Sequence, residues 1–334
     1  MKKNIGNLPI KLKGDINMVV LITGITGMIG SHFAKSCQER GWKTYGIARS
    51  SASSRMVAIE DERIIRCDIL DSYALSEVFR RIKPDIVIHL AAQAFNGISW
   101  QMPNITHQTN YFGTLNMLEC CRIISPNAKI LIACSSAEYG DVKPEDCPLK
   151  EERLLKPMSP YGVSKVATEN LGFQYSINYK MKILFPRLFI HVGTGHPPAT
   201  AIQNFARQLA LIAKGKLDPI VRVGNLETAR DFIDVRDGVK AMMIILEKGK
   251  YREPYNICSG EAVKISEALK ILINISGLDI KIVKDSNLLR PSDEPLLLGD
   301  NSKLKKLGWS REFAFKETLE AVYYDWMNRI NGEI

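Results

Sequence analysis

The sequence predicts an α/β protein built on a doubly wound parallel sheet, with a smaller C-terminal lobe. Two observations indicate this fold class. Over roughly the first 190 residues, short apolar runs of strand length alternate with stretches of helical periodicity. A glycine-rich turn also follows the first apolar run, where a parallel sheet passes from its first strand into its first helix.

The N-terminal half shows the alternation most clearly. Met18–Thr23 is a continuous apolar run, as expected for a strand buried on both faces. A helical pattern over Met28–Glu39 follows, and Gly41 is placed to end it. Further strands are predicted at Lys43–Ala48, Arg63–Cys67, Ile86–Leu90 and Ile130–Ala133, with helices at Tyr73–Arg81, Thr109–Ile123 and Val163–Tyr179.

After about residue 190 the alternation loosens. Gly193, Gly195, Pro197 and Pro198 mark a loop. Helices are predicted at Ala201–Lys214, Val235–Glu247, Ile265–Ile275 and Phe315–Ile330, with strands at Ile220–Val223 and Lys281–Val283. We expect residues 191–334 to form mainly a substrate-binding lobe, with returns to the first domain. It should cover the carboxyl edge of the sheet, where open α/β sheets bind ligands.

The glycine turn points to a dinucleotide. Gly24, Gly27 and Gly30 are spaced G-x-x-G-x-x-G, which differs from the G-x-G-x-x-G of other dinucleotide folds. Such glycines allow a tight turn and close approach of the backbone to a pyrophosphate at the helix N-terminus. We therefore assign residues 18–190 to a Rossmann-type NAD(P)-binding domain.

The residues that follow the second and third strands suggest which dinucleotide binds. An acidic residue after the second strand would bind the ribose 2′-hydroxyl of NAD. The sequence has Arg49 there, and a guanidinium suits the 2′-phosphate of NADP. NADP(H) is therefore preferred, with NAD(H) possible. Asp68, after the third strand, suits either the adenine amine or the N-cap of the next helix.

Tyr161 and Lys165 are the candidate catalytic pair. They stand four residues apart, so on a helix they share one face. A phenol is a poor acid–base group at neutral pH, and a nearby ammonium favours its ionised form. Tyr139 and Lys143 have the same spacing, but Gly140 and the proline after Lys143 indicate a turn. Tyr161 instead follows Ser159-Pro160, a typical helix start.

A hydroxyl group is expected as the third catalytic member. Ser135 and Ser136 end the buried strand predicted at Ile130–Ala133. At the carboxyl edge of the sheet, either hydroxyl could bond a substrate oxygen. We assign Ser135 to catalysis, against the alternative of a strand-end cap.

Composition excludes several other functions. The net charge of +9 comes from scattered lysines and arginines, which argues against nucleic-acid binding and is compatible with an anionic substrate. The seven cysteines show no metal-ligand spacing, so we expect no metal site and reduced thiols in a cytoplasmic protein. No apolar run is long enough to span a membrane, and residues 1–17 are expected to form a flexible basic tail.

The motifs together resemble the extended short-chain dehydrogenase/reductases, in their nucleotide-sugar branch. The resemblance rests on the glycine turn, Asp68-Ile69, His89–Ala92, Thr109-Asn110, Gly113-Thr114, Ser135-Ser136, Tyr139-Gly140 and Ser159–Lys165. Later segments look like the enzyme pair GDP-mannose 4,6-dehydratase and GDP-4-keto-6-deoxymannose reductase. These segments are Val223–Phe232, Asp234–Asp237, Arg290–Asp293, Leu298–Asp300 and Leu307–Trp309.

The resemblance implies a cofactor site and a nucleotide-sugar site. The cofactor site would comprise Gly24, Gly27, Met28, Ile29, Gly30, Arg49, Asp68, Ile69, Leu90, Ala91, Ala92, Tyr161, Lys165, Leu188 and His191. The substrate, most simply a GDP-sugar, would contact Ser136, Glu138, Asn204, Arg230 and Arg290, the two arginines at its diphosphate. A homodimer through the helices Thr109–Ile123 and Val163–Tyr179 is also implied.

One position separates reduction from dehydration. Dehydratases of this branch carry a glutamate two residues after the catalytic hydroxyl, as the base that removes water. Here that position is Ala137, and alternation along an extended segment would aim the neighbouring Glu138 elsewhere. The sequence thus favours NAD(P)H-dependent reduction of a 4-keto-6-deoxy sugar. A 4,6-dehydratase or 4-epimerase with recycled cofactor and a non-catalytic dinucleotide-binding protein are the alternatives.

Two departures leave the sugar open. Ile190 stands where related enzymes often have a substrate-contacting asparagine, and Ala94 where a polar residue is common. The nucleotide base and the stereochemistry of the sugar are not indicated by these residues.

Overall fold

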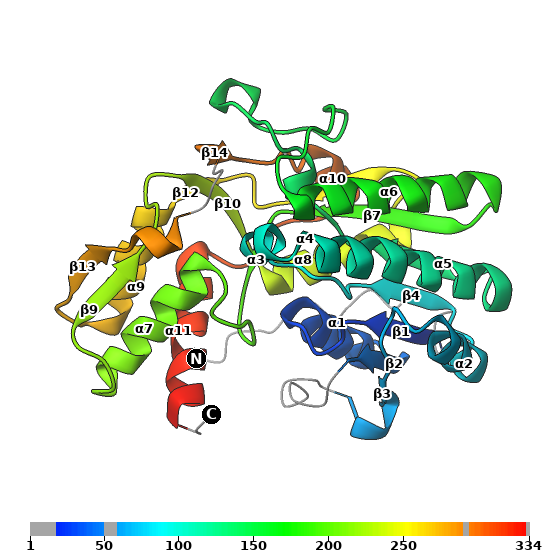
Figure 1. Cartoon of the computed structure of the whole chain (residues 1–334), viewed down its shortest axis with the longest axis horizontal. Helices are drawn as coiled ribbons and strands as arrows, with labels where there is room; N and C mark the ends of the chain where they lie inside the picture. Colours follow the sequence, from blue (N-terminus) through cyan, green and yellow to red (C-terminus); the bar gives the residue numbers. More distant parts are fainter. Residues whose placement is uncertain (1–17, 50–58, 290–293, 332–334) are drawn as a thin grey trace, which may run out of the picture.

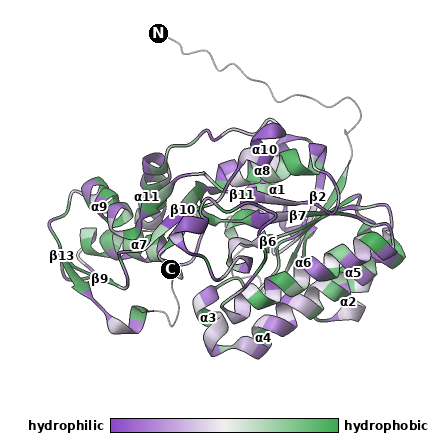
Figure 2. Ribbon diagram, turned by 90° about the horizontal axis from the view of Figure 1, so that it is seen from above, coloured by the Kyte–Doolittle hydropathy of each residue, from purple (hydrophilic) through white to green (hydrophobic). Residues whose placement is uncertain are grey.

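The computed structural model describes residues 18–49, 59–289 and 294–331, so the predicted tail over residues 1–17 and Arg290 lie outside the described residues. The described chain forms a large parallel sheet between two helix layers, with a smaller lobe to one side (Figures 1 and 2). None of the described helices is both long and apolar enough to cross a membrane.

The large sheet confirms the predicted fold class. Its strand order is β11-β7-β5-β4-β1-β2-β3, and each neighbouring pair is parallel. The order reverses between β1 and β4, the place where doubly wound sheets bind ligands at their carboxyl edge. The strands are β1 (Val19–Thr23), β2 (Lys43–Ala48), β3 (Ile64–Arg66), β4 (Ile86–His89), β5 (Lys129–Ile132), β7 (Lys182–Leu188) and β11 (Pro254–Ile257), while short β6 (Cys134–Ser135) pairs with β7.

Helices cover both faces of this sheet. Alternate residues of β1 face opposite sides: Val20 and Ile22 pack toward one helix layer, and Leu21 toward the other. The first layer contains α1 (Met28–Glu39) and α8 (Val235–Lys248), and the second contains α2 (Ser72–Ile82), α5 (Gly113–Ile124) and α6 (Pro160–Asn178).

The lobe has its own apolar core, at the left of Figure 1. It is built from α7 (Ala201–Ala213), α9 (Ile265–Ser276), α11 (Phe315–Asn331) and the parallel pair β9 (Ile220–Val223) and β13 (Lys281–Lys284). A second sheet holds β8 (Ile190–Val192), β10 (Ala229–Asp234), β12 (Ala262–Lys264) and β14 (Leu296–Leu297). The strand β11 is part of the large sheet, and α8 packs against it. The C-terminal half of the chain therefore contributes to the large sheet and its helix layer as well as to the lobe.

Most predicted helices and strands are confirmed within one or two residues, but the helix predicted at Thr109–Ile123 differs. α3 (Asn96–Gln101) and α4 (Pro103–His107) precede a π-helical turn over Gln108–Phe112, and α5 begins only at Gly113. The side chain of Asn110 accounts for this turn, because it bonds Gln93 and Ser164 rather than solvent. Such π-turns often mark functional sites.

Candidate active site

The glycine turn packs tightly against the end of β4. Gly24 has a φ of 73°, and a Cβ built on it would lie 2.8 Å from the backbone nitrogen of Ala91. A Cβ on Gly30 would lie 2.3 Å from the carbonyl oxygen of Gly24. A side chain at either position would push these segments apart, so both positions require glycine.

α1 begins with backbone donors available to a ligand. Its N-cap is Gly27, and no side chain caps the helix. The first N–H groups of a helix lack intrahelical partners, and the helix dipole favours an anion there. Met28 and Ile29 form the first turn, and Leu90, Ala91 and Ala92 are half-buried at the end of β4. This arrangement fits the diphosphate of a dinucleotide.

The residues predicted near the adenosine end lie after β2 and β3. Arg49 is exposed directly after β2, and Asp68 is exposed after β3. The Asp68 carboxylate accepts a hydrogen bond from the Leu70 nitrogen at 2.9 Å, while Asp71 caps α2. The alternative interpretation of Asp68 as the N-cap is therefore wrong. Ile69 is buried and packs directly over Gly113.

The candidate catalytic pair, Tyr161 and Lys165, lies at the start of α6. Ser159 caps this helix by accepting a hydrogen bond from the Gly162 nitrogen at 3.1 Å, and Pro160 occupies the first turn. Lys165 is buried, and its Nζ donates to the Ala133 carbonyl at 2.7 Å and lies 5.9 Å from the Tyr161 ring centre. An ammonium has three donors, so two remain for a ligand.

The turn that carries Ser135 lies against the first turn of α6. A Cβ built on Gly162 would be 2.4 Å from the Ala137 carbonyl oxygen, so the two backbones are in direct contact. Ser135 and Ser136 are buried, and the Ser135 Oγ accepts a hydrogen bond from the Ala137 nitrogen at 3.2 Å. The Ser135 hydroxyl proton is thus free to be donated to a ligand. The structure therefore places Ser135 next to the helix turn that carries Tyr161.

Glu138 points into the protein interior, which argues against the substrate contact expected for it. Its side chain is fully buried, and Oε1 accepts a hydrogen bond from the Ser135 nitrogen at 2.8 Å. Burial, together with the neighbouring Glu169 carboxylate, raises the pKa of Glu138 well above its ordinary value. The physical reason is that Arg187 lies on the interior side of the turn, 3.6 Å from Oε2, and draws the carboxyl inward.

The second tyrosine–lysine pair is a structural feature. Tyr139 is buried, and its hydroxyl donates to the Asn256 side chain at 2.7 Å. Gly140 follows with a φ of 64°, so Tyr139 and Lys143 do not share a helix face. The glycine and proline in this segment correctly indicated a turn.

Two buried polar residues at this edge were not assigned to the site from the sequence. His89 bonds Thr23 at 2.8 Å and Thr114 at 2.9 Å, which ties β1 and β4 to α5. Burial first, and then the Lys165 charge, lowers the pKa of His89 to about 3. Asn110 donates to the Ser164 hydroxyl at 2.8 Å and so fixes α6 to the π-turn. The only sequence signal was their place in the motifs His89–Ala92 and Thr109-Asn110.

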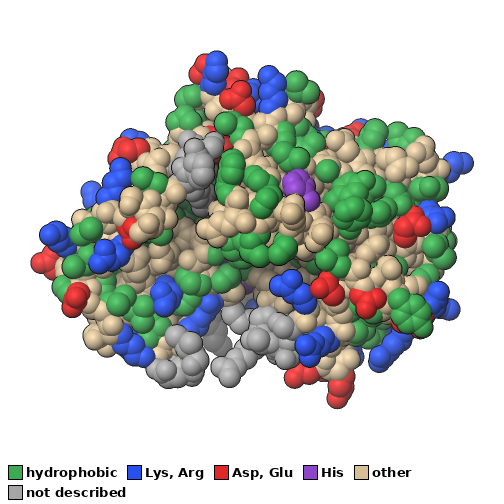
Figure 3. Space-filling model, in the orientation of Figure 1, with side chains coloured by type: hydrophobic (Ala, Val, Ile, Leu, Met, Phe, Trp, Pro, Cys, Tyr) green, Lys and Arg blue, Asp and Glu red, His purple; other side chains and the backbone are tan. Residues whose placement is uncertain are grey.

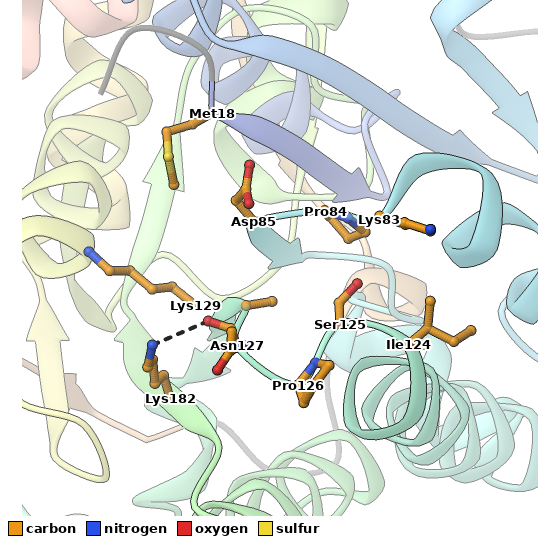
Figure 4. A pocket seen from close by; sticks show the side chains of 11 residues that line it. Met18, Lys83, Pro84, Asp85, Ile124, Ser125, Pro126, Asn127, Lys129 and Lys182 are labelled. Atoms are coloured by element: carbon orange, nitrogen blue, oxygen red, sulfur yellow. Dashed lines mark hydrogen bonds between the residues drawn. The ribbon is translucent and has the colours of Figure 1, made fainter. Parts of the chain in front are cut away.

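A large hollow of the surface lies at the opposite edge of the sheet. It has a volume of 370 Å³ and is lined by residues before or at the start of β1, β4, β5 and β7, with Lys83, Asp85, Asn127 and Lys182 among them (Figure 4). No predicted site residue lines it. The candidate active site is therefore defined by the carboxyl edge and not by this hollow.

Comparison with known proteins identifies the family. The model for GDP-mannose 4,6-dehydratase matches residues 21–322. The chain belongs to the GDP-mannose 4,6-dehydratase family. This family membership, with the Rossmann-type sheet, makes it a nucleotide-sugar enzyme of the short-chain dehydrogenase/reductase type.

Individual relatives in this family differ in reaction. The chain is 30% identical to the GDP-6-deoxy-D-mannose reductase of Pseudomonas aeruginosa, over 94% of this chain and 99% of the relative. It is 28% identical to a GDP-mannose 4,6-dehydratase of Yersinia enterocolitica, over 89% and 90%. The solved structure of RMD from Pseudomonas aeruginosa complexed with NADPH superposes with a TM-score of 0.81 at 29% identity, covering 93% and 99%.

The remaining predicted residues lie on β7, β8, α7 and β10. Leu188 ends β7 and is half-buried. The His191 ring packs on Gly238 of α8, with Nδ1 hydrogen-bonded to the Phe189 carbonyl, and burial lowers its pKa to about 4. Asn204 is half-buried on α7, and Arg230 is buried on β10, where it donates to the Glu294 carbonyl at 2.6 Å.

The two departures from the family pattern have different surroundings. Ile190 is half-buried and packs against the apolar core of the lobe. Ala94 is exposed in the loop after β4. The apolar residue at 190 is therefore accounted for by packing.

Proposed function

We propose that the protein reduces the 4-keto group of a nucleotide-linked 6-deoxy sugar, with NADPH as the electron donor. GDP-4-keto-6-deoxy-D-mannose is the proposed substrate and GDP-D-rhamnose, or a closely related sugar, the product. The family and the reductase among the relatives support the substrate class.

The observation that carries this proposal is that the turn after Ser135 offers no accessible carboxylate base. Elimination of water from the sugar requires a base close to the catalytic hydroxyl. Ala137 has no titratable group, and the carboxyl group of Glu138 is buried against the Ser135 nitrogen and Arg187. Reduction of a ketone needs a hydride and a proton donor but no such carboxylate, so this turn favours reduction over dehydration.

Each proposed catalytic residue has a role that its contacts permit. Bound NADPH would supply the hydride. Tyr161 would donate the proton to the oxygen at sugar C4, and Ser135 would hydrogen-bond that oxygen with its free hydroxyl proton. Lys165 would hold the nicotinamide ribose with the two ammonium protons that Ala133 leaves free.

The preference for NADPH rests on Arg49. Its exposed guanidinium lies just after β2, where the adenosine ribose of a dinucleotide would bind. A guanidinium binds a phosphate through paired, charge-assisted hydrogen bonds. The binding of NADPH by the Pseudomonas RMD structure agrees with this preference.

The lobe is the proposed binding site of the nucleotide sugar. Arg230 lies on β10 and is held by hydrogen bonds to the carbonyls of Ala229 and Glu294. An arginine fixed in this way is suited to a diphosphate. Asn204, Ser136 and Arg290 remain proposed substrate contacts, Arg290 lying outside the described residues.

We also propose a cytoplasmic homodimer. Figure 3 shows hydrophobic side chains gathered over the helices α4, α5 and α6. Exposed apolar residues in or next to α5 and α6 include Phe112, Ile123, Phe173, Ile177 and Tyr179. An exposed apolar patch of this kind is typical of a protein–protein interface. All seven cysteines are free, as expected in a reducing compartment.

A ligand screen with product analysis tests the function. Thermal shift would be measured with NADPH or NADH, each crossed with GDP, CDP, UDP and dTDP, and NADPH oxidation with 4-keto-6-deoxy sugar nucleotides would follow. We expect stabilisation by NADPH and GDP, and one NADPH consumed per sugar reduced. Product without net cofactor change would instead indicate a dehydratase or epimerase. If the protein converts none of these sugars, and if Tyr161→Phe leaves its function in the cell intact, it would be a non-catalytic dinucleotide-binding protein.

A further inference from the structure

A buried cluster of charges lies behind the Ser135 turn. Arg187, on β7, has only 5% of its side chain exposed. Its Nε and one terminal nitrogen donate to the two carboxylate oxygens of Glu169 at 2.9 and 2.6 Å. Burial would lower the pKa of Arg187, but Glu169 outweighs burial and raises it. This fork-shaped pair is the most rigid type of ion pair that side chains form.

Each carboxyl of the cluster comes from a different part of the proposed catalytic apparatus. Glu169 is on α6, one turn after Lys165, while Glu138 is in the turn that begins with Ser135. The Glu138 Oε1 accepts the Ser135 N–H at 2.8 Å, and Oε2 lies 3.6 Å from the Arg187 Nε. Arg187 is thus in contact with both parts through one guanidinium.

The remaining guanidinium nitrogen fixes Arg187 itself. It donates to the Tyr139 hydroxyl at 3.2 Å and to the Glu151 carbonyl at 2.9 Å. Tyr139 in turn bonds Asn256 of β11. The arginine therefore cannot move without breaking contacts to the large sheet.

A metal ion is a poor alternative occupant of this cluster. Cys134, Glu138 and Glu169 each offer an atom within 4.8 Å of the others. However, burial raises the pKa of the Cys134 thiol well above its ordinary value, so the metal-binding thiolate is disfavoured. The Arg187 guanidinium already supplies the positive charge that Glu169 requires.

We propose that Glu138, Arg187 and Glu169 are positioning residues, which set the placement of Ser135 relative to Tyr161 and Lys165 by joining the Ser135 turn to α6. This inference rests on the proposed function, because it concerns the residues assigned to that reaction. It adds three residues that contact neither cofactor nor substrate but act through the Ser135 backbone.

The charge state of the cluster agrees with this role. Burial first, and then the Glu169 carboxylate, raises the pKa of Glu138. Burial alone would raise the pKa of Glu169, but its hydrogen bonds from Arg187 lower it. These opposite shifts favour the negative charge on Glu169, opposite the Arg187 guanidinium. In this state Glu138 keeps Oε1 as the acceptor for the Ser135 N–H.

Two substitutions of Glu138 separate positioning from general stability. Glu138→Leu keeps most of the volume but removes the acceptor for the Ser135 N–H, whereas Glu138→Gln keeps an oxygen that can accept it. We expect Glu138→Leu to lower kcat by ~10- to 100-fold, because small displacements of a reacting group have effects of this size. The KM values for NADPH and the keto sugar should stay within ~3-fold, since neither ligand touches Glu138. Glu138→Gln should stay within ~3-fold of the wild-type kcat.

Asp237→Asn provides the matched control. Asp237 is a fully buried carboxylate on α8 that accepts the backbone N–H groups of Glu312 and Phe313, far along the chain from Ser135. At a temperature where all variants are folded, Asp237→Asn should leave kcat unchanged. Equal losses of kcat in Asp237→Asn and Glu138→Leu would overturn the proposal, and so would a wild-type kcat in folded Glu138→Leu.

Hydrogen–deuterium exchange at the Ser135 amide gives a readout that does not depend on the reaction. We expect faster exchange at this amide in Glu138→Leu, and wild-type exchange in Glu138→Gln. If the wild type reduces no keto sugar but exchange behaves in this way, the proposed function fails while the positioning of the turn stands. Unchanged exchange in Glu138→Leu overturns the positioning role, whatever the reaction.

Discussion

The two turns beside the candidate active site are built in opposite ways. The turn after β1 consists of glycines in close backbone contact, and α1 begins without a side-chain cap. The turn after β6 is held from behind by the buried side chains of Glu138 and Arg187. The first turn thus leaves backbone N–H groups available to a ligand, whereas in the second the backbone of Ser135 is held by a buried side chain.

The largest expected effect is at Tyr161, whose helix turn adjoins the Ser135 turn. Tyr161→Phe should lower kcat by ~10³-fold, in the range that loss of a general acid produces. The affinity for NADPH, measured by fluorescence titration, should change little. Tyr175→Phe is the matched control, because Tyr175 lies on the same helix and its hydroxyl bonds Glu119. Equal kcat values for the two variants would remove Tyr161 from the mechanism.

The next effect concerns the glycine turn. Gly30→Ala places a methyl group 2.3 Å from the Gly24 oxygen, so the turn must open. We expect the Kd for NADPH to rise ~10- to 100-fold, which corresponds to the usual cost of overpacking. Gly97→Ala is the control, because no atom lies within 4 Å of a Cβ at that glycine. If Gly30→Ala binds NADPH as tightly as the wild type, the turn is not the diphosphate site.

The difference between the two turns also explains which parts of the fold the sequence could predict. The glycine turn, α1 and β2 follow from local spacing and periodicity, and the structure confirms their bounds. The pattern did not predict β7, because it contains Pro186 and the charged Arg187. Pro186 is tolerated because β5 pairs only with Lys182–Leu184 and β6 only with Arg187 and Leu188. Arg187 is tolerated because Glu169 neutralises it.

Glu138 has one local partner and one distant one: the Ser135 N–H, which donates to Oε1 in a capping box, and Arg187, which lies 3.6 Å from Oε2. Alternation along the chain suggested that Glu138 would point away from Ala137, but not what it would contact. Arg187 lies 49 positions later in the sequence, and no local pattern joins the two. The inward direction of Glu138 therefore argues against the substrate contact expected for it, whereas Ser135, Tyr161 and Lys165 follow from local motifs and remain predictions.

A smaller effect is expected at the far end of the cofactor site. Arg49→Ala should raise the Kd for NADPH ~10-fold, as for loss of a charge-assisted hydrogen bond near solvent. The Kd for NADH should stay the same, because NADH lacks the 2′-phosphate. Isothermal titration with both cofactors checks this. Parallel losses of affinity for NADPH and NADH would show that Arg49 does not select the cofactor.

The smallest expected effect is the pH dependence that His89 gives to the free energy of unfolding. Burial lowers the pKa of His89 to about 3, so the folded protein holds this ring neutral, whereas the unfolded chain protonates it near pH 6.5. Its contribution is thus complete above pH 6.5 and is lost as the pH falls toward 3. Between pH 7.5 and 5.5 the free energy of unfolding should decrease by about 1 kcal/mol through His89.

Urea unfolding of the wild type and His89→Asn at both pH values measures this contribution. The decrease between pH 7.5 and 5.5 should be smaller in the variant by about 1 kcal/mol. The same decrease in both proteins would mean that His89 is not held neutral. Thr23 and Thr114, the two partners of the ring, remain in place for the comparison.

Transfer of deuterium from NADPH tests the central claim most directly. The protein would be incubated with GDP-4-keto-6-deoxy-D-mannose and NADPH that carries deuterium at both hydrogen positions of the nicotinamide C4, and the sugar product examined by mass spectrometry and NMR. We expect one deuterium at sugar C4 for each NADPH oxidised. Formation of a GDP-6-deoxy sugar without deuterium at C4 would overturn the proposed reduction.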